Sequence, residues 1–270
     1  MLKKRLIPNI ILNNGQIVQS VNFRHTNVIG NAITAVDFFN SWAVDEILVL
    51  DVSRTKEFRN KFYKIIEGLS KRCFIPLTIG GWITSIEEIQ LLLKLGADKI
   101  SINTEAVKNP EFIKNASNIF GSQCIVVSID VKKKELNEYE VFIERGKKGT
   151  KLHPKEWAQK VELLGAGEIL LTSIDKEGKK DGYDLELIRM ISEHVSIPVI
   201  AFGGVGQWDH FVDGIKIGKA DAVSAANIFH YSEHSTFNAK QHMIESGLDV
   251  RKPVFYKLPT PRKPKYEEIY

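Results

Sequence analysis

One segment of the chain, Ile75-Pro76-Leu77-Thr78-Ile79-Gly80-Gly81, returns later in similar form as Ile197-Pro198-Val199-Ile200-Ala201-Phe202-Gly203-Gly204. Each copy is a short apolar run that ends in two glycines, which is typical of a strand buried in a parallel sheet. Ala97-Asp98 recurs as Ala220-Asp221 at a similar offset, and Asp45-Glu46-Ile47-Leu48 resembles Gly167-Glu168-Ile169-Leu170. Three matches in register predict that the protein consists of two similar halves.

Further apolar runs of this kind alternate with amphipathic segments along the first 250 residues. Between Ile86 and Leu93, for example, apolar residues keep helical spacing, and Gly96 supplies a C-terminal stop. Eight such β/α units that close on themselves form a (β/α)8 TIM barrel, here built from two half-barrels. An open doubly wound sheet is the main alternative, but its glycine fingerprint after the first strand is absent. Strands are expected at residues 6–12, 47–51, 75–79, 99–102, 125–130, 168–172, 197–202 and 221–224.

The charge of the chain is unevenly distributed. Its 270 residues hold 37 basic and 33 acidic side chains, but the last 20 residues contain six Lys/Arg and two Glu, so the first 250 carry 31 of each sign. A neutral body argues against nucleic-acid binding. We expect one barrel domain over residues 1–250 and an extended, Pro- and Lys-rich tail over residues 251–270. Its aromatic residues, such as Phe255 and Tyr256, favour docking on a partner over disorder.

Cysteine content and hydropathy place the protein in a reducing compartment away from the membrane. Cys73 and Cys124 form no C-x-x-C pair, and no stretch approaches the roughly 20 apolar residues of a membrane helix. We therefore expect a soluble, cytoplasmic protein. His230 and His234 have helical spacing but no third ligand nearby, so we expect neither a metal nor an organic cofactor.

The repeat also predicts where ligands bind. In barrels of this kind, the carboxyl ends of the strands expose backbone amides and short helix N-termini that suit phosphate. The alternative is that the glycines only permit tight turns, but their recurrence in both halves favours two phosphate sites and a ligand with two phosphates. The first site would use Gly80, Gly81, Asn103 and Thr104, and the second would use Gly178, Gly203, Gly204, Ala226 and Asn227.

Two acidic residues end predicted strands. Asp130 closes the apolar run Ile125-Val126-Val127-Ser128-Ile129, and Asp51 closes the second strand. A carboxylate at this rim is placed for general acid/base chemistry, which we favour over simple capping. Lysines at 132–134 and 147–148 flank a loop after Asp130, which we expect to fold as a hairpin over the same face.

Further motifs occur along the first 250 residues, and they include Ile7-Pro8, Gly96-Ala97-Asp98-Lys99-Ile100-Ser101-Ile102-Asn103-Thr104, Phe120-Gly121-Ser122-Gln123, the segment 165–175 and Gly182-Tyr183-Asp184. Together with Gly80-Gly81, these motifs resemble a known family, the cyclase subunit of imidazole glycerol phosphate synthase, over about residues 1–250. The family's barrel docks a glutaminase on its N-terminal face, takes ammonia through its core and uses it at the opposite face. Its reaction converts a bis-phosphorylated ribulosyl formimino aminoimidazole carboxamide nucleotide and ammonia to imidazole glycerol phosphate and AICAR, in histidine biosynthesis.

The resemblance implies roles for several residues. Arg5, Glu46, Lys99 and Glu168 match the family's ring of charges at the barrel floor, where ammonia enters; an ion cluster that serves stability alone is the alternative. Asp98 and Gln123 match positions that face the glutaminase. Thr172 belongs to the matching segment 165–175, and we expect it to contact the substrate together with Asp51, which ends the second strand.

The substrate face departs from the family pattern. The family ends its first and fifth strands with catalytic aspartates, and here Asp130 is kept while Ile11 stands at the first position. Because loss of a general acid or base commonly costs a factor of about 100 to 10,000 in rate, the chain's own cyclase turnover comes into question. The other departures are Gln19 for a lysine, Trp82 for a glycine, Glu177 for an aspartate and Asn227 for a serine.

Three functions remain open at this point. The first is an ammonia-channelling subunit that works with a glutaminase and supplies a separate amidotransferase acting on a surface-polysaccharide sugar. The second is a working cyclase in which Asp130 carries both proton transfers. The third is a non-catalytic activator of the glutaminase that conducts no ammonia.

Overall fold

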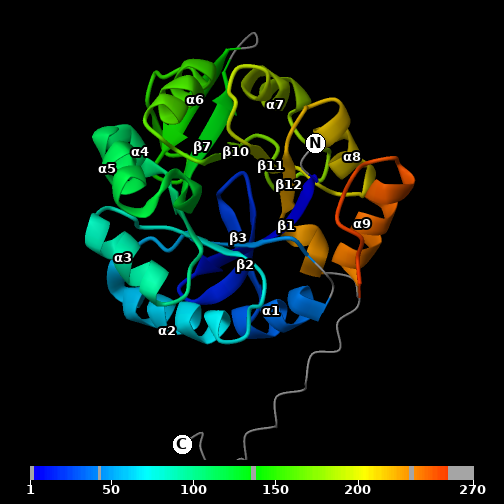
Figure 1. Cartoon of the computed structure of the whole chain (residues 1–270), viewed down its shortest axis with the longest axis horizontal. Coiled ribbons are helices and arrows are strands. Elements are labelled where there is room, and N and C mark those ends of the chain that lie inside the picture. The colour runs from blue at the N-terminus through cyan, green and yellow to red at the C-terminus, as the bar shows by residue number, and fades with distance from the viewer. Residues whose placement is uncertain (1–2, 42–43, 135–137, 231–233, 255–270) are drawn as a thin grey trace, which may run out of the picture.

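The computed structural model describes residues 3–41, 44–134, 138–230 and 234–254, and the structural statements below refer to these residues. Eight parallel strands close into a barrel, because the last strand pairs with the first and the fifth with the sixth. Helices surround it (Figure 1). The barrel strands, in chain order, are β1 (Arg5–Asn13), β4 (Ile47–Asp51), β5 (Leu77–Gly80), β6 (Lys99–Ile102), β7 (Ile125–Lys133), β10 (Glu168–Ser173), β11 (Val199–Phe202) and β12 (Ala222–Ala225).

The helices follow the strands as the sequence pattern predicts. Ser85 begins the helix after β5 by accepting a hydrogen bond from the Glu88 amide (3.2 Å), and Asp184 caps a later helix in the same way. None of the helices in the described ranges is long and apolar enough to span a membrane. The α-helices are α1 (Ala32–Ser41), α2 (Arg59–Ser70), α3 (Ile86–Lys94), α4 (Thr104–Lys108), α5 (Glu111–Phe120), α6 (Pro154–Leu163), α7 (Leu185–Ser192), α8 (Asp209–Lys216) and α9 (Ser235–Glu245), with short 3-10 turns η1 (Lys56–Phe58), η2 (Ser122–Cys124) and η3 (Asn227–His230).

All eight predicted strands are confirmed, and the differences lie at their ends. β5 and β11 each begin two residues later than predicted, because Pro76 and Pro198 have no amide hydrogen to contribute to a ladder. Their carbonyls still accept hydrogen bonds from the Ile47 and Ile169 amides, both at 2.9 Å. The predicted tail falls mostly outside the described residues, which end at Val254.

Two hairpins rise from the barrel. β8 (Tyr139–Ile143) and β9 (Lys148–Gly149) extend β7 in antiparallel fashion, which confirms the hairpin expected after Asp130. A second hairpin, β2 (Gln16–Val21) and β3 (His25–Gly30), follows β1 and was not predicted.

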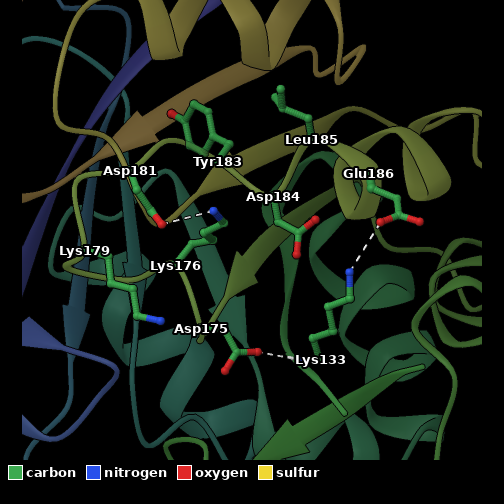
Figure 2. Close-up of a pocket in the computed structure, with 9 residues that line it drawn as sticks. All are labelled: Lys133, Asp175, Lys176, Lys179, Asp181, Tyr183, Asp184, Leu185 and Glu186. Carbon is green, nitrogen blue, oxygen red and sulfur yellow. Dashed lines mark hydrogen bonds and ion pairs between the residues drawn. The ribbon is translucent and has the colours of Figure 1, made fainter. Parts of the chain in front are cut away.

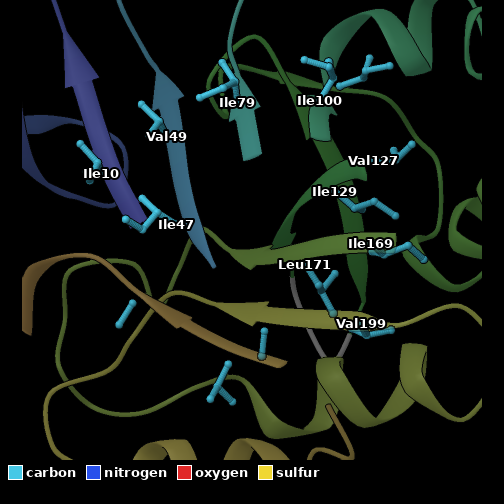
Figure 3. Close-up of a cluster of buried hydrophobic side chains, with 14 of the residues drawn as sticks. Ile10, Ile47, Val49, Ile79, Ile100, Val127, Ile129, Ile169, Leu171 and Val199 are labelled. Carbon is cyan, nitrogen blue, oxygen red and sulfur yellow. The ribbon is translucent and has the colours of Figure 1, made fainter. Parts of the chain in front are cut away.

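The side chains of the barrel strands form two separate apolar layers. Ile47 and Val49 of β4 pack outward against the helices, in the cluster that Figure 3 shows. Leu48 and Leu50 of the same strand point to the barrel axis and join a smaller inner cluster. This alternation follows from the period of two residues in a strand. The inner cluster lines the barrel axis between its two ends.

A repeated hydrogen bond joins neighbouring strands at their amino ends. In three places an aspartate just before one strand accepts the amide of the preceding strand, and its own amide returns a bond to that strand. The amides of Leu6, Leu77 and Val199 donate to Asp45, Asp98 and Asp221 at 2.9, 2.8 and 3.1 Å. Gly167 stands at the fourth such place and keeps only the backbone bond. The same contact therefore recurs in three of the four pairs of β/α units along the barrel, and its backbone part recurs in the fourth.

Candidate functional site

A closed ring of four charges lies at the amino ends of the strands, which we call the floor. Arg5 Nη1 lies 2.8 Å from Glu46 Oε2 and 3.1 Å from Glu168 Oε1. Lys99 Nζ lies 2.8 Å from the same Glu46 oxygen and 3.0 Å from Glu168 Oε1. Each cation bridges both carboxylates. The structure thus brings together all four residues predicted for the floor ring.

The charges of the floor ring are largely buried, so each of them needs an oppositely charged partner within the ring. Glu46 is only 2% exposed and also accepts a hydrogen bond from the Thr78 hydroxyl (2.6 Å). Burial alone would lower the pKa of Arg5, but the nearby carboxylates of Glu168 and Glu46 outweigh it and raise that pKa. Because a buried charge without a partner is costly, two positive and two negative groups stabilise one another here.

The same face carries a rim of exposed apolar side chains that the sequence analysis did not single out. They occur near the carboxyl ends of helices or in the connections that enter strands, so they lie around the floor. Gln123, in η2 ahead of β7, is exposed on this face too. Asp98 is also here, but its Oδ2 accepts the Leu77 amide. The floor rim consists of Phe38, Phe74, Ile119, Leu163 and Ile217, which are 50%, 74%, 59%, 87% and 49% exposed.

The barrel interior above the floor ring is almost entirely apolar. The exceptions include the hydroxyls of Ser101 and Ser224 and the side-chain amide of Asn9 on β1, which are buried and have no hydrogen-bond partner among the described residues. These two serines lie on β6 and β12, at equivalent places of the repeat. A small hydrogen-bonding molecule inside the barrel would satisfy them. The apolar lining comprises Ile7, Ile11, Leu48, Val126, Leu170, Ile200, Phe202 and Ala222.

Asp130 lies at the carboxyl ends of the strands, which we call the mouth. It is 8% exposed, and Asn103 Nδ2 donates to its Oδ2 at 3.1 Å. Burial raises the pKa of Asp130 to about 7, although hydrogen bonds from Asn103, Thr172 and Ser128 oppose that rise. A carboxyl group with this pKa can give or take a proton near neutral pH.

The mouth offers no second acid at the end of β1. Ile11 is 7% exposed there and packs in the inner cluster with Val18 of β2. Gln19 lies in β2 opposite Asn27 of β3. The end of β1 therefore presents an apolar side chain to the mouth.

Asp51 ends β4 with its carboxylate already engaged. Oδ1 accepts the Ser53 amide (3.0 Å) and hydroxyl, and Oδ2 lies 3.5 Å from Arg59 Nη1. Arg59 in turn pairs with Glu88, which also accepts the Tyr63 hydroxyl. Asp51 therefore organises the loop after β4, and any contact it makes with a ligand would share this network.

The glycines predicted for the second phosphate site adopt conformations that favour glycine. Gly203 and Gly204 have φ of +98° and +107°, and a Cβ on Gly204 would lie 2.0 Å from the Gly182 carbonyl oxygen. Ala226 and Asn227 follow β12, where η3 begins. Gly178 instead lies against the unpredicted hairpin, because a Cβ there would be 2.5 Å from the Ser20 carbonyl oxygen.

Glu177 ties that hairpin to the loop after β10. Its Oε1 accepts the Ser20 hydroxyl (2.7 Å), its Oε2 accepts the Phe23 amide (3.0 Å), and its carbonyl accepts the Asn22 amide (3.0 Å). Burial raises the pKa of Glu177 against the opposing effect of these hydrogen bonds. We call this contact the Glu177 latch. The turn signal Asn13-Asn14-Gly15, followed by alternation in 16–21, could have predicted the hairpin, but not its contact with Glu177.

The residues predicted for the first phosphate site, Gly80, Gly81, Asn103 and Thr104, also converge, at the ends of β5 and β6. The Thr104 hydroxyl accepts the amide of Glu144, which belongs to the turn between β8 and β9. Arg145, in the same turn, donates a hydrogen bond to the Ser53 carbonyl oxygen, 92 positions away in the chain. No sequence signal indicated this contact.

A surface pocket of about 360 Å3 lies beside the mouth, between the end of β7 and the loop before α7 (Figure 2). Its charges pair with one another, as in Lys133 with Glu186 (3.5 Å) and Lys176 with Asp181 (3.2 Å). Asp175 accepts the Lys133 amide at 2.7 Å. These pairs stabilise the two loops, and Lys176 also lies against the loop of Gly204.

Comparison with known proteins fits this geometry. Residues 5–235 match the model of the family described as histidine biosynthesis protein. A protein of Vibrio vulnificus (strain YJ016), provisionally named imidazole glycerol phosphate synthase subunit hisF2, is 49% identical over 251 residues, which cover 93% of this chain and 92% of the relative. The chain belongs to the histidine biosynthesis protein family, and it is of the cyclase-subunit type of imidazole glycerol phosphate synthase.

Proposed function

We propose that the protein receives ammonia from a glutaminase subunit docked on its floor and passes it through the barrel. The observation that carries this proposal is the floor ring of Arg5, Glu46, Lys99 and Glu168, surrounded on the same face by an exposed apolar rim. Exposed apolar residues that gather around one feature mark an interaction surface. The partner would be a glutaminase, as the family resemblance implies, and would form a heterodimer with this chain.

The composition of the interior supports the passage of ammonia in its neutral form. The inner cluster is apolar, and a charged ammonium ion would lose its hydration there at a high cost in free energy. Neutral ammonia loses far less hydration free energy, and the unpartnered hydroxyls of Ser101 and Ser224 can hydrogen-bond to it inside the barrel. The floor ring would act as the gate, since it must open for ammonia to enter.

The use of the ammonia is the more specialised part of the proposal. Ile11 places an apolar side chain where the family resemblance implies an acid, so the usual cyclisation lacks one proton carrier. We propose that a separate amidotransferase, acting on a surface-polysaccharide sugar, receives the ammonia. Robust cyclase turnover of the family nucleotide by the purified chain with ammonium salt would falsify this specialised use.

The channelling proposal is tested with Lys99→Phe in the complex with the glutaminase. We expect glutamine-dependent formation of the final product to fall at least about tenfold, while glutamine hydrolysis continues and added ammonium salt restores the product. Lys64→Phe, at an exposed lysine of α2, is the matched control and should leave all three rates unchanged. An unchanged rate of product formation from glutamine in Lys99→Phe contradicts channelling.

A working cyclase is the second candidate, and the pKa of about 7 at Asp130 favours it. In this case one carboxyl group carries both proton transfers. Ile11→Asp should then change turnover of the family nucleotide only modestly. A rise from no turnover to full activity in that variant counts against this candidate.

A non-catalytic activator of the glutaminase is the third candidate. The observation that favours it is that all four ion pairs of the floor ring are formed, since a ring held shut by these pairs would block the passage of ammonia. Under this candidate, Lys99→Phe leaves both glutamine hydrolysis and delivery to the final product unchanged.

A further inference from the structure

The two glycine loops at the mouth share a backbone conformation and then diverge. Gly81 and Gly204 both have φ of +107°, and a Cβ on either would collide with a carbonyl oxygen, that of Asp51 at 2.4 Å or that of Gly182 at 2.0 Å. The next residue is Trp82 in the first half and the small, buried Val205 in the second. The difference between the halves therefore begins at Trp82.

Trp82 occupies a backbone region that side chains disfavour. Its φ is +58°, and surrounding contacts must hold it there. The indole Nε1 donates to the Ser53 carbonyl oxygen at 3.0 Å. The Lys56 ammonium lies 5.8 Å from the centre of the indole ring, within the range of a cation–π contact. The side chain is thus fixed across the loop that follows β4.

The turn at residues 144–146, which we call the strap, also contacts Trp82. Arg145 donates to the same Ser53 carbonyl oxygen, and its guanidinium carbon lies 5.8 Å from the Trp82 ring centre. The Glu144 amide donates to the Thr104 hydroxyl at 3.1 Å, and its carboxylate pairs with Lys108 at 2.8 Å. The strap is therefore anchored at two separate loops.

The order of the strands shows what lies between these anchors. Ser53 follows β4 and Thr104 follows β6, while β5 pairs with both strands and lies between them. A strap fixed at Ser53 and Thr104 must therefore cross the end of β5, where Gly80 and Gly81 lie. It also uses the Thr104 hydroxyl that a ligand in the first half would need.

We infer that Trp82 and Arg145 close the anion site of the first half, so that the mouth accepts a small molecule with one phosphate or carboxylate end, held at Gly203 and Gly204. This inference rests on the proposed function, because it assumes that the mouth takes an anionic ligand. It makes Trp82 a residue that determines specificity, because its side chain excludes a ligand with two phosphates.

The test follows the backbone amides of the full chain, labelled with 15N-glycine, while inorganic phosphate is added. In the wild type we expect saturable shifts of the Gly203 and Gly204 signals and none at Gly80 and Gly81. In Trp82→Gly, whose new residue suits the observed φ, both pairs should shift, with apparent affinities within about tenfold of each other. Trp157→Phe, at a tryptophan buried in α6, is the control and should behave as the wild type.

Two further outcomes separate the possible failures. If the Gly203 and Gly204 signals shift, the closure of the first anion site is overturned by either of two results. One is a saturable shift of the Gly80 and Gly81 signals in the wild type, and the other is the absence of such a shift in Trp82→Gly. If neither pair responds in any variant, the anionic ligand of the mouth fails together with the closure. Should Trp82→Gly not fold, Arg145→Gln decides the matter, because it weakens the contacts of the strap with the Ser53 carbonyl and the Trp82 ring and should allow the Gly80 and Gly81 signals to shift.

Discussion

Arg5 and Lys99 are joined through one oxygen atom, since Glu46 Oε2 lies 2.8 Å from Arg5 Nη1 and 2.8 Å from Lys99 Nζ. Glu168 completes the floor ring but is more exposed, at 14% of its side chain against 2% for Glu46. The ring is thus asymmetric. Glu46 holds both cations from a buried position, whereas Glu168 holds them closer to solvent, so the ring opens more easily on the side of Glu168.

This asymmetry predicts unequal effects of removing the two carboxylates. Glu46→Ala should lower the free energy of unfolding by about 3–5 kcal/mol, because it leaves two cations short of a buried partner. Glu168→Ala should cost less, because water can reach the site and screen the cations. Urea denaturation measures both, with Glu67→Ala, in an exposed pair, as a control that leaves the midpoint nearly unchanged. Equal losses for Glu46→Ala and Glu168→Ala would contradict the asymmetry.

A second prediction concerns the titration of Asp130. Because burial raises the pKa of Asp130 to about 7, its carboxyl carbon should titrate with a midpoint near neutral pH in a 13C NMR experiment. Asn103→Ala removes a hydrogen bond that favours the ionised form, so the midpoint should move up. A midpoint near 4 in the wild type, or a downward move in the variant, contradicts this account.

The same pKa has a consequence for stability. An Asp130 carboxyl with a pKa of about 7 when folded and near 4 when unfolded binds more protons in the folded state between these values. Its contribution to stability is therefore present below about pH 4 and is lost as the pH rises to about 7. Asp130→Asn has no group that titrates here. Between pH 4 and pH 7 the free energy of unfolding of this variant should therefore rise relative to that of the wild type, by of order 4 kcal/mol. Urea unfolding at pH 4, 6 and 8 measures the difference.

A third prediction addresses the Glu177 latch. Glu177→Ala removes the acceptor of the Phe23 amide and of the Ser20 hydroxyl, while β2 and β3 keep their own ladder. A hydrogen bond to a charged acceptor contributes about 1.5–3 kcal/mol, so exchange of the Phe23 amide hydrogen should speed up by about 10- to 100-fold. The Ile100 amide, in β6 of the barrel, should keep its rate. Unchanged exchange at Phe23 would show that the latch does not hold the hairpin.

The sequence predicts the barrel better than it predicts the mouth, for a physical reason. Strand positions such as 47–51 and 125–130 follow from local apolar runs. The floor ring follows from the family resemblance, and its four residues stand at the amino ends of strands, where the barrel fixes their positions. The contact of Arg145 with Ser53 joins side chain to backbone across 92 positions, and it depends on the shape of a turn. Such contacts are set by tertiary packing, so neither periodicity nor spacing reveals them.

A final prediction separates structure from binding at Asp98. Asp98 and Asp221 accept equivalent strand amides, so Asp98→Ala and Asp221→Ala should each lower the free energy of unfolding by about 1–2 kcal/mol. Asp45→Ala should cost more, about 3–5 kcal/mol, because Asp45 also pairs with the fully buried Lys240 at 2.6 Å.

If Asp98 also faces the glutaminase, Asp98→Ala should weaken the complex and Asp221→Ala should not. Both variants lose an equivalent hydrogen bond to a strand amide, but only Asp98 would lie beside the partner. Calorimetric titration of the glutaminase into each variant measures this, with Phe74→Ala on the floor rim as the positive control. Equal affinity in Asp98→Ala and Asp221→Ala would restrict Asp98 to its structural hydrogen bond. A selective loss in Asp98→Ala would give one carboxylate two uses, with Oδ2 held by the Leu77 amide and Oδ1 left to meet the partner.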